Sequence, residues 1–193
     1  MPIPTPAKTI SPSELPGDKI LKGDPAGDNK EDAMERGTQI HLLLEHLPMA
    51  EPANRRDLGL QLLQNNDTVL VEEVMALIDK PELAWLWDAT ALTEVDITAD
   101  IPGLGRVHGA IDRLLIGSDT ITAIDYKSNR LVPTKPEDTP IGLARQLAAY
   151  DNALQQIYPD HTIKTAILWT HTGTLTVLSR QHLHEALNAL ATS

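Results

Sequence analysis

The chain of 193 residues contains no cysteine, no phenylalanine and only 3% aromatic residues. Without cysteine it cannot form disulfides, zinc–thiolate sites or an iron–sulfur cluster, so carboxylates, imidazoles and backbone oxygens are its available metal ligands. The scarcity of aromatic side chains disfavours a base-stacking platform of the kind that many single-strand-binding proteins use. The length and the hydrophobic content of 41% fit one domain with a single core and some trailing chain.

Long apolar runs are also absent. No stretch approaches the roughly 18 residues of a membrane span, so we expect no membrane partner. The opening MPIPTPAKTISPSELPGD has no apolar block suited to a secretory signal, which makes the cytoplasm the expected compartment. A Gly-x-x-x-x-Gly-Lys-Ser/Thr loop is missing as well, so we expect no nucleotide cofactor and no nucleotide-driven motor in this chain.

The net charge of −11 looks unsuited to a protein that binds nucleic acid, but it is unevenly distributed. Residues 1–100 contain 8 Lys and Arg against 19 Asp and Glu, whereas residues 101–193 contain 8 of each kind. The plain interpretation of the acidic half is a solvated helical surface that keeps the protein soluble. Electrostatic attraction alone would not bring this chain to DNA, so we expect another component to deliver a DNA substrate.

The hydrophobic pattern predicts an α/β fold: a mixed β-sheet flanked by helices, with an N-terminal helical region. Residues 1–30, rich in Pro, Gly, Asp, Lys and Ser, are interpreted as an extended linker or arm, and residues 31–193 as the domain. Helices are predicted, with Asn54 and Asp67 as N-caps of the second and third, at residues 31–47, 55–66, 67–80, 142–158 and 180–193, and a short helical turn at 81–88. Strands are predicted at residues 90–101, 105–117, 119–128, 162–172 and 174–180.

The hairpin RVHGAIDRLLIGSDTITAIDYKSNRL, residues 106–131, carries charges where a core strand needs apolar residues. Asp112 and Asp125 lie between apolar neighbours on adjacent strands, and Lys127 shares a strand face with Asp125. Such a group is costly to desolvate unless something compensates the two acids. An isolated Asp-x-Lys is usually a surface salt bridge, but the second acid and the apolar flanks favour a divalent cation, Mg²⁺ or Mn²⁺, as the partner.

At this point the chain resembles the RecB-type branch of the PD-(D/E)XK nucleases. GAIDRL followed by IDYKS matches the signature strands, GTQIH matches a Gly-x-x-x-His element, and QLAAY matches a Gln-x-x-x-Tyr element, all in the family order. The wording LTEVDITADIPGLGRVHGAIDRLLI and the early SPSEL resemble in particular the C-terminal nuclease domain of the AddA helicase–nuclease subunits of AddAB double-strand-break repair enzymes. The absence of cysteine weighs against relatives with an iron–sulfur staple.

The resemblance implies a restriction-endonuclease-like core and a role for each matched residue. His41, Asp112, Asp125 and the backbone carbonyl of Tyr126 would bind Mg²⁺ or Mn²⁺, and Lys127 would position the attacking water. The catalytic set would therefore be Glu94, Asp112, Asp125 and Lys127, with Glu94 as an additional acid near the metal. Gln146 and Tyr150 project from one helix face and would organise the site or bind the DNA substrate.

Some of these residues also have a plainer interpretation. His41 could be a satisfied histidine at the edge of the core, Glu94 a solvated strand residue, and Gln146 and Tyr150 the flanks of a buried leucine stripe.

The resemblance implies a metal-dependent DNA nuclease, exonuclease or endonuclease, that acts in recombinational repair. Its partners would be DNA, as single strands or duplex ends, an AddB-like subunit, and a linked helicase domain that feeds it. A nuclease domain without its helicase would be an excised domain or a stand-alone nuclease. Two alternatives stay open: a nuclease-shaped docking or DNA-binding module without catalytic activity, and a stand-alone exonuclease with the same chemistry.

Overall fold

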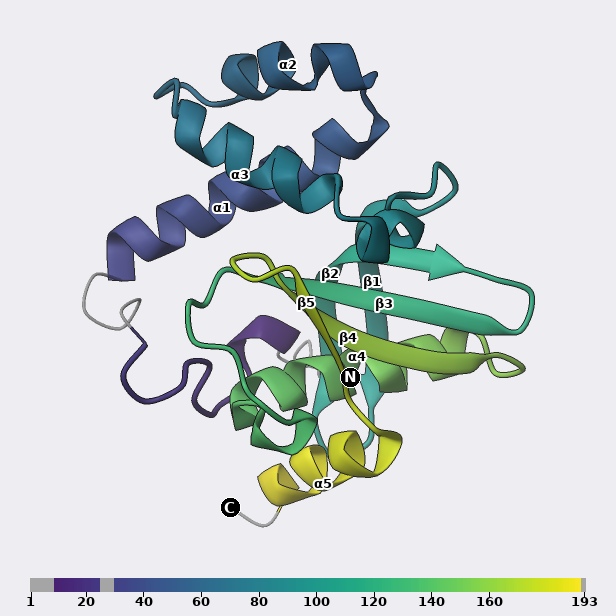
Figure 1. Ribbon diagram of the computed structural model, residues 1–193. Helices are drawn as coiled ribbons and strands as arrows, with labels where there is room; N and C mark the ends of the chain where they lie inside the picture. The colour runs from purple at the N-terminus through teal and green to yellow at the C-terminus, as the bar shows by residue number, and fades with distance from the viewer. Residues whose placement is uncertain (1–8, 25–29, 192–193) are drawn as a thin grey trace, which may run out of the picture.

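A five-stranded mixed sheet with helices on both faces forms the body of the molecule, for which the computed structural model describes residues 9–24 and 30–191 (Figure 1). In order across the sheet, the strands are β1 (Leu92–Ile101), β2 (Gly105–Ile116), β3 (Thr120–Lys127), β4 (Thr162–Trp169) and β5 (Thr174–Val177). The α-helices are α1 (Lys30–His46), α2 (Arg55–Leu62), α3 (Thr68–Ile78), α4 (Ile141–Ile157) and α5 (Arg180–Ala191). Short 3-10 helices are η1 (Pro12–Glu14), η3 (Leu47–Met49), η4 (Pro52–Asn54), η5 (Pro81–Trp87) and η6 (Pro136–Asp138). The predicted α/β fold class is confirmed.

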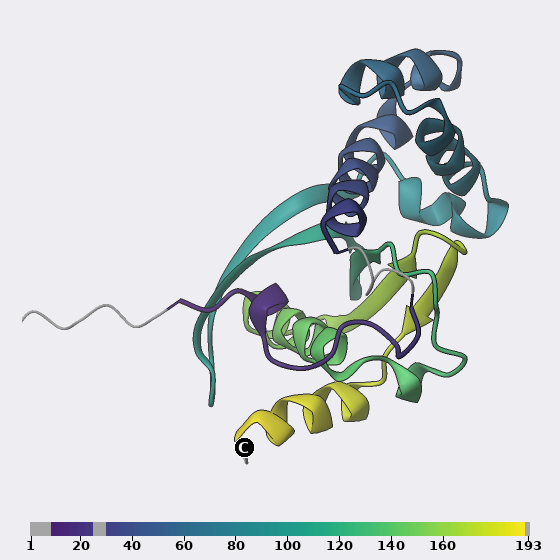
Figure 2. The same ribbon diagram turned by 90° about the vertical axis from the view of Figure 1, so that its left-hand side faces the viewer.

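The sheet is mixed because its strands are connected in two ways. β1, β2 and β3 form an antiparallel meander, while β4 is parallel to β3 and therefore needs a crossover, which α4 supplies. β5 returns antiparallel to β4. Figure 2 shows the long β1–β2 ribbon curving away from the rest of the sheet, so the two ends of this ribbon have different surroundings.

Alternation along β3 divides the apolar residues between two cores. Ile121 and Ala123 pack with α4 and α5, whereas Ile124 and Tyr126 pack with the helical region of α1, α3 and η5. β4 repeats the pattern, with Ile167 in the first core and Leu168 in the second. Each fully buried aliphatic side chain stabilises such a core by about 1.5–3 kcal/mol. The same alternation sends the Asp125 side chain to the α4 face of the sheet.

The predicted elements are found within a few residues of their expected bounds, and one predicted cap is wrong. Asp67 caps α3, because its Oδ1 accepts a hydrogen bond from the Leu70 backbone N–H at 3.0 Å. Asn54 makes no side-chain cap bond to α2. The 3-10 helix η4 runs directly into α2, and the Arg55 N–H is already bonded to the Pro52 carbonyl, so the turn replaces the cap. Among the helices of the described residues, none is long and apolar enough to cross a membrane.

Residues 9–24 lie along the domain, although the segment 1–30 was expected to be a linker or arm. Ile10 adds a parallel bridge to Val107 of β2, and Leu15 is buried in the α4 core at 3% exposure. Further along, the Gly142 N–H donates to the Asp18 carbonyl at 2.9 Å. Residues 1–8, 25–29 and 192–193 lie outside the described residues, and the domain boundary at residue 30 stays a prediction.

The contact between this segment and α4 has no room for a side chain at Gly142. A Cβ atom there would lie 2.5 Å from the Gly17 carbonyl oxygen and 2.9 Å from that of Asp18. We expect Gly142→Ala to lower the free energy of unfolding by about 1–3 kcal/mol, measured by urea denaturation, because overpacking forces backbone apart. Gly37→Ala on α1 is the matched control, since its Cβ would meet only Ser128 Oγ at 3.4 Å. Equal stability of the two variants would show that the segment does not pack as described.

Candidate active site

Five elements bring the predicted site residues to one end of the sheet. Asp112 comes from β2, Asp125 and Lys127 from β3, Glu94 from β1, His41 from α1, and Gln146 and Tyr150 from α4. The hairpin turn predicted at residues 117–119 is present, with the Gly117 N–H donating to the Thr120 carbonyl at 2.9 Å, and it fixes the register of β2 against β3.

Asp125 and Lys127 form a close ion pair on the α4 face of the sheet. The Lys127 Nζ lies 2.5 Å from Asp125 Oδ2, and the Asp125 side chain is only 4% exposed. The other oxygen of this carboxylate accepts a hydrogen bond from Gln146 Nε2 at 2.7 Å. Both oxygens are therefore held, and the ammonium of Lys127, 20% exposed, is fixed at the edge of the solvent.

Gln146 and Tyr150 hold this carboxylate from behind. Gln146 Nε2 also donates to the Tyr150 hydroxyl at 3.0 Å, and that hydroxyl donates to the Ala110 carbonyl of β2 at 2.7 Å. The two residues are 4% and 3% exposed. Of the two roles that the sequence allowed, this burial favours organising the site over contacting DNA.

His41 joins α1 to the two central strands. Its Nδ1 lies 3.2 Å from Asp112 Oδ1, and its Nε2 lies 3.2 Å from the Tyr126 carbonyl oxygen. Oxygens of both kinds accept hydrogen bonds, so the ring satisfies both only when both nitrogens carry a proton. The second oxygen of Asp112 accepts from the Tyr126 N–H at 2.5 Å. The carbonyl predicted as a metal ligand thus pairs with His41 in this arrangement.

Glu94 lies across from Asp112 on the neighbouring strand. The flanking pairs of the β1–β2 ladder, Thr93 with Arg113 and Val95 with Ile111, leave these two acids opposite each other. Like charges at such positions destabilise a sheet. Glu94 also has a φ of 49°, a left-handed conformation that costs a residue with a side chain about 1–3 kcal/mol and is concentrated at functional sites.

The donor atoms at this point suit a hard divalent cation. One ligand atom from each of His41, Glu94 and Asp112 lies within 4.8 Å of the others. Two carboxylates and an imidazole are a ligand set that Mg²⁺ or Mn²⁺ accepts. Asp125, also predicted as a ligand, is not in this group, because its oxygens are bonded to Lys127 and Gln146.

The pKa shifts report the crowding of negative charge. Burial lowers the pKa of His41, but the hydrogen bond and the charge of Asp112 outweigh it and raise the pKa overall. Burial raises the pKa of Asp125, with the charge of Lys127 opposing this effect and that of Asp112 adding to it. Burial and the neighbouring Asp112 likewise raise the pKa of Glu94. All three groups therefore hold protons to a higher pH than usual.

Lys19 is a residue of this site that the sequence did not indicate. Its backbone carbonyl accepts a hydrogen bond from Asn129 Nδ2 at 3.1 Å, just beyond the end of β3. Burial lowers the pKa of Lys19, and the positive charge of Lys127 lowers it further. The segment before α1 thus brings a second ammonium group to the site. A lysine in a Pro- and Gly-rich stretch carries no local signal of this placement, since the contact spans most of the chain.

Arg113 is a second residue that the sequence did not indicate. It is fully buried beside Asp112 in the sequence, its Nε donates to the Leu86 carbonyl, and its guanidinium lies 5.0 Å from the centre of the Trp87 ring. A buried cation over an aromatic face ties η5 to the sheet. The alternation of β2 could have suggested it, since Arg113 faces away from Asp112.

Comparison with known proteins gives a family and two relatives. The family model described as the PD-(D/E)XK nuclease superfamily matches residues 18–186. The chain is 29% identical over 154 residues to an ATP-dependent helicase/nuclease subunit of Lactiplantibacillus plantarum, and 26% identical over 150 residues to the protein of the same name from Desulforamulus reducens. These matches cover 67% and 64% of this chain but only 12% of each relative.

The geometry around His41 predicts that a metal ion and protons compete for the site. Because the pKa of His41 and that of Glu94 are raised, both groups lose their protons only as the pH rises through these raised values. We expect the affinity for Mn²⁺, measured by isothermal titration calorimetry, to increase about tenfold between about pH 6 and pH 8, with proton release.

Asp112→Asn should abolish the saturable heat, and Asp100→Asn, an exposed acid further along β1, should leave it unchanged. The same affinity at both pH values, or binding that survives in Asp112→Asn, would contradict the assignment of His41, Glu94 and Asp112 as ligands.

Proposed function

Because the chain belongs to the PD-(D/E)XK nuclease superfamily, we propose that it is a metal-dependent nuclease that hydrolyses phosphodiester bonds in DNA. One observation carries the proposal. A three-donor group, His41, Glu94 and Asp112, lies next to a lysine that is ion-paired to a buried aspartate. Neither feature is needed for stability, because opposed acids such as Glu94 and Asp112 repel each other and a buried ion pair such as Asp125–Lys127 contributes little net stabilisation.

His41, Glu94 and Asp112 would hold the cation, Mg²⁺ or Mn²⁺, and the role of Asp125 as a further ligand remains part of the proposal. When bound, the cation would neutralise the acids, lower the pKa of a water molecule and offset the charge that develops on the phosphate. The imidazole of His41 must give up its proton to bind a metal, and the Asp112 carboxylate that now faces it would turn to the ion.

Lys127 would position the attacking water and stabilise the negative charge on the phosphate. Its ammonium group is fixed by Asp125 at 2.5 Å and remains partly exposed, as a group that contacts substrate must be. Lys19 adds positive charge near Lys127, and its backbone is anchored by Asn129. A fixed cation in a partly dehydrated site stabilises developing charge without reorganisation during the reaction.

Gln146 and Tyr150 would act by positioning Asp125. The chain of hydrogen bonds from the Ala110 carbonyl through Tyr150 and Gln146 fixes one carboxylate oxygen, so that the other can hold Lys127. Small displacements of a catalytic group reduce the reaction rate by large factors, so buried hydrogen bonds that fix its position contribute to catalysis.

The setting of this nuclease in the cell is the second part of the proposal. The curated relatives are named as subunits of an ATP-dependent helicase/nuclease, and the chain spans about an eighth of their length. We infer that it works in double-strand-break repair, beside a helicase that feeds it DNA and an AddB-like subunit. The net charge of −11 supports this, because a protein so acidic gains little from long-range attraction to DNA.

Removal of the ion-paired residues tests the nuclease activity. With Mg²⁺ or Mn²⁺ and end-labelled single- and double-stranded DNA, we expect Asp125→Ala and Lys127→Ala to reduce the cutting rate by at least about 10²–10⁴-fold, the usual contribution of a positioned acid–base group. Lys164→Ala, an exposed lysine on β4, is the matched control and should cut like the unchanged protein. Circular dichroism checks that each variant is folded. Undiminished cutting by folded Lys127→Ala would refute the proposal.

Kinetics of Tyr150→Phe separate a positioning role from a DNA contact. The change removes the hydroxyl that bonds to Gln146 and to the Ala110 carbonyl. We expect kcat to fall about tenfold with KM unchanged, because only the placement of Asp125 suffers. Tyr158→Phe, at the end of α4, serves as the control. If KM rose while kcat stayed constant, Tyr150 would be a DNA contact after all.

A further inference from the structure

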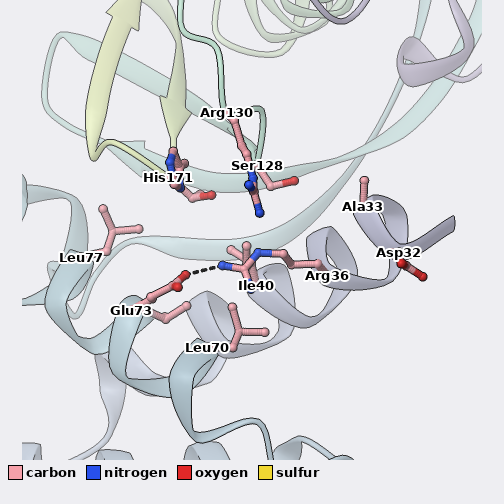
Figure 3. Close-up of a pocket in the computed structure, with 12 residues that line it drawn as sticks. Asp32, Ala33, Arg36, Ile40, Leu70, Glu73, Leu77, Ser128, Arg130 and His171 are labelled. Carbon is pink, nitrogen blue, oxygen red and sulfur yellow. Dashed lines mark hydrogen bonds and ion pairs between the residues drawn. The ribbon is translucent and has the colours of Figure 1, made fainter. Parts of the chain in front are cut away.

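A cavity of about 290 Å³ lies beside the metal-binding residues, between α1, α3 and the ends of β3 and β4 (Figure 3). Its volume is just below that of the smallest ligand pockets, about 300 Å³. None of the residues that line it was assigned a role above, although several directly adjoin residues that were. Its lining has two chemically different sides.

One side of the cavity is polar and cationic. Arg130 and His171 extend into it from above in Figure 3, and Ser128 adds a hydroxyl. Within the ranges that the structure describes, neither Arg130 nor His171 forms an ion pair or a side-chain hydrogen bond, so both have donors to offer. A guanidinium and an imidazole N–H are the groups that bind phosphate oxygens most directly.

The acidic residues of the cavity do not cancel this charge. Glu73 of α3 is ion-paired with Arg36 of α1, as the dashed line in Figure 3 marks, so these two charges offset each other. Asp32 lies in the first turn of α1, and Figure 3 shows its carboxylate directed away from Arg130. The free charge that faces the cavity is therefore positive.

The opposite side of the cavity is aliphatic. Ile40 of α1 and Leu70 and Leu77 of α3 form a smooth wall that belongs to the second core. The aliphatic side chains of this wall offer no hydrogen-bonding group, so the wall can contact the flat face of a base without distinguishing one base from another. A cationic side opposite an apolar side matches a nucleotide, with its phosphate on one side and its base on the other.

Three lining residues adjoin residues of the candidate metal-binding site, two along the chain and one through a hydrogen bond. Ile40 precedes His41 on α1, and Ser128 follows Lys127 at the end of β3. Thr170, another lining residue, donates its backbone N–H to the Lys127 carbonyl at 2.9 Å. α1 also runs close to this end of β3, since a Cβ atom at Gly37 would lie at an ordinary contact distance of 3.4 Å from Ser128 Oγ.

From this arrangement we propose that the cavity is a subsite for one nucleotide of a single DNA strand next to the bond that is cut. The inference rests on the proposed nuclease function. Arg130 and His171 bind the phosphate of that nucleotide, and the aliphatic wall receives its base without sequence preference. The cavity of about 290 Å³ is small, so the occupant that we propose is one unpaired nucleotide and not a base pair. The subsite therefore selects unpaired ends.

Two variants test the subsite by binding alone. Arg130→Ala removes the phosphate contact, and Ala33→Trp fills the cavity from α1, where Ala33 is half-buried. The probe is a fluorescein-labelled 12-residue oligothymidylate, and its Kd is measured by fluorescence anisotropy in EDTA. We expect each variant to weaken binding about tenfold, the contribution of one charge-assisted hydrogen bond or of one excluded base.

Matched controls lie on the outer face of the helical region. Arg56→Ala removes the same charge from a residue paired with Glu72, and Ala76→Trp adds the same bulk on exposed α3. Both should change Kd less than twofold. If Ala33→Trp does not fold, Ala33→Leu replaces it. Folded Arg130→Ala and cavity-filling variants that bind as tightly as the controls would overturn the subsite.

Cutting of oligothymidylates that each carry one abasic position distinguishes this inference from the proposed function. With Mn²⁺, an abasic position should slow cutting by the unchanged protein at one fixed distance from it, and Ala33→Trp should cut modified and unmodified strands equally. No metal-dependent cutting at all would defeat the nuclease proposal, while the anisotropy result would still decide the subsite. Cutting that is indifferent to the abasic position would overturn the subsite alone.

Discussion

The arrangement of the candidate site depends on how the excess of negative charge at one end of the sheet is compensated. Glu94 and Asp112 oppose each other on adjacent strands, and the Asp125 carboxylate is buried on the next strand. Left uncompensated, these groups would cost several kcal/mol in desolvation and repulsion. Lys127 compensates Asp125 directly, and His41, whose pKa is raised by this contact, pairs with Asp112. The divalent cation that we propose would compensate Glu94 and Asp112 at once.

The two cores position these charges from opposite faces of the sheet. The α1–α3 region packs on Ile124 and Tyr126 and so carries His41 to Asp112, while α4 packs on Ile121 and Ala123 and carries Gln146 to Asp125. Because successive residues of β3 face opposite cores, helices on both faces of the sheet fix the position of this one short strand. The residues before α1 close the arrangement by bringing Lys19 to the end of the same strand. A displacement of either helical layer would therefore also displace the charged side chains of the site.

The charge distribution fits a nuclease that receives its substrate rather than attracting it. The acidic excess lies in the first half of the chain, whereas the cationic side chains of Lys19, Lys127 and Arg130 gather near the end of β3. Attraction from these few side chains guides a strand only over short distances, within about 10 Å at ordinary salt. Such short-range attraction would be sufficient for a strand delivered by the helicase that we propose as a partner.

The sequence by itself determined the order and type of the elements, because hydrophobic period and turn chemistry are local. It also identified Asp112, Asp125 and Lys127, since charges between apolar residues of a strand stand out at short range. Tertiary structure alone decided the rest. It decided which atoms meet: one Asp125 oxygen contacts Lys127 and the other Gln146, and His41 contacts Asp112. It also brought Lys19 to the site and Arg130 to the adjoining cavity. These contacts join residues far apart in the chain, and no local pattern encodes which distant side chains the packing of two cores brings together.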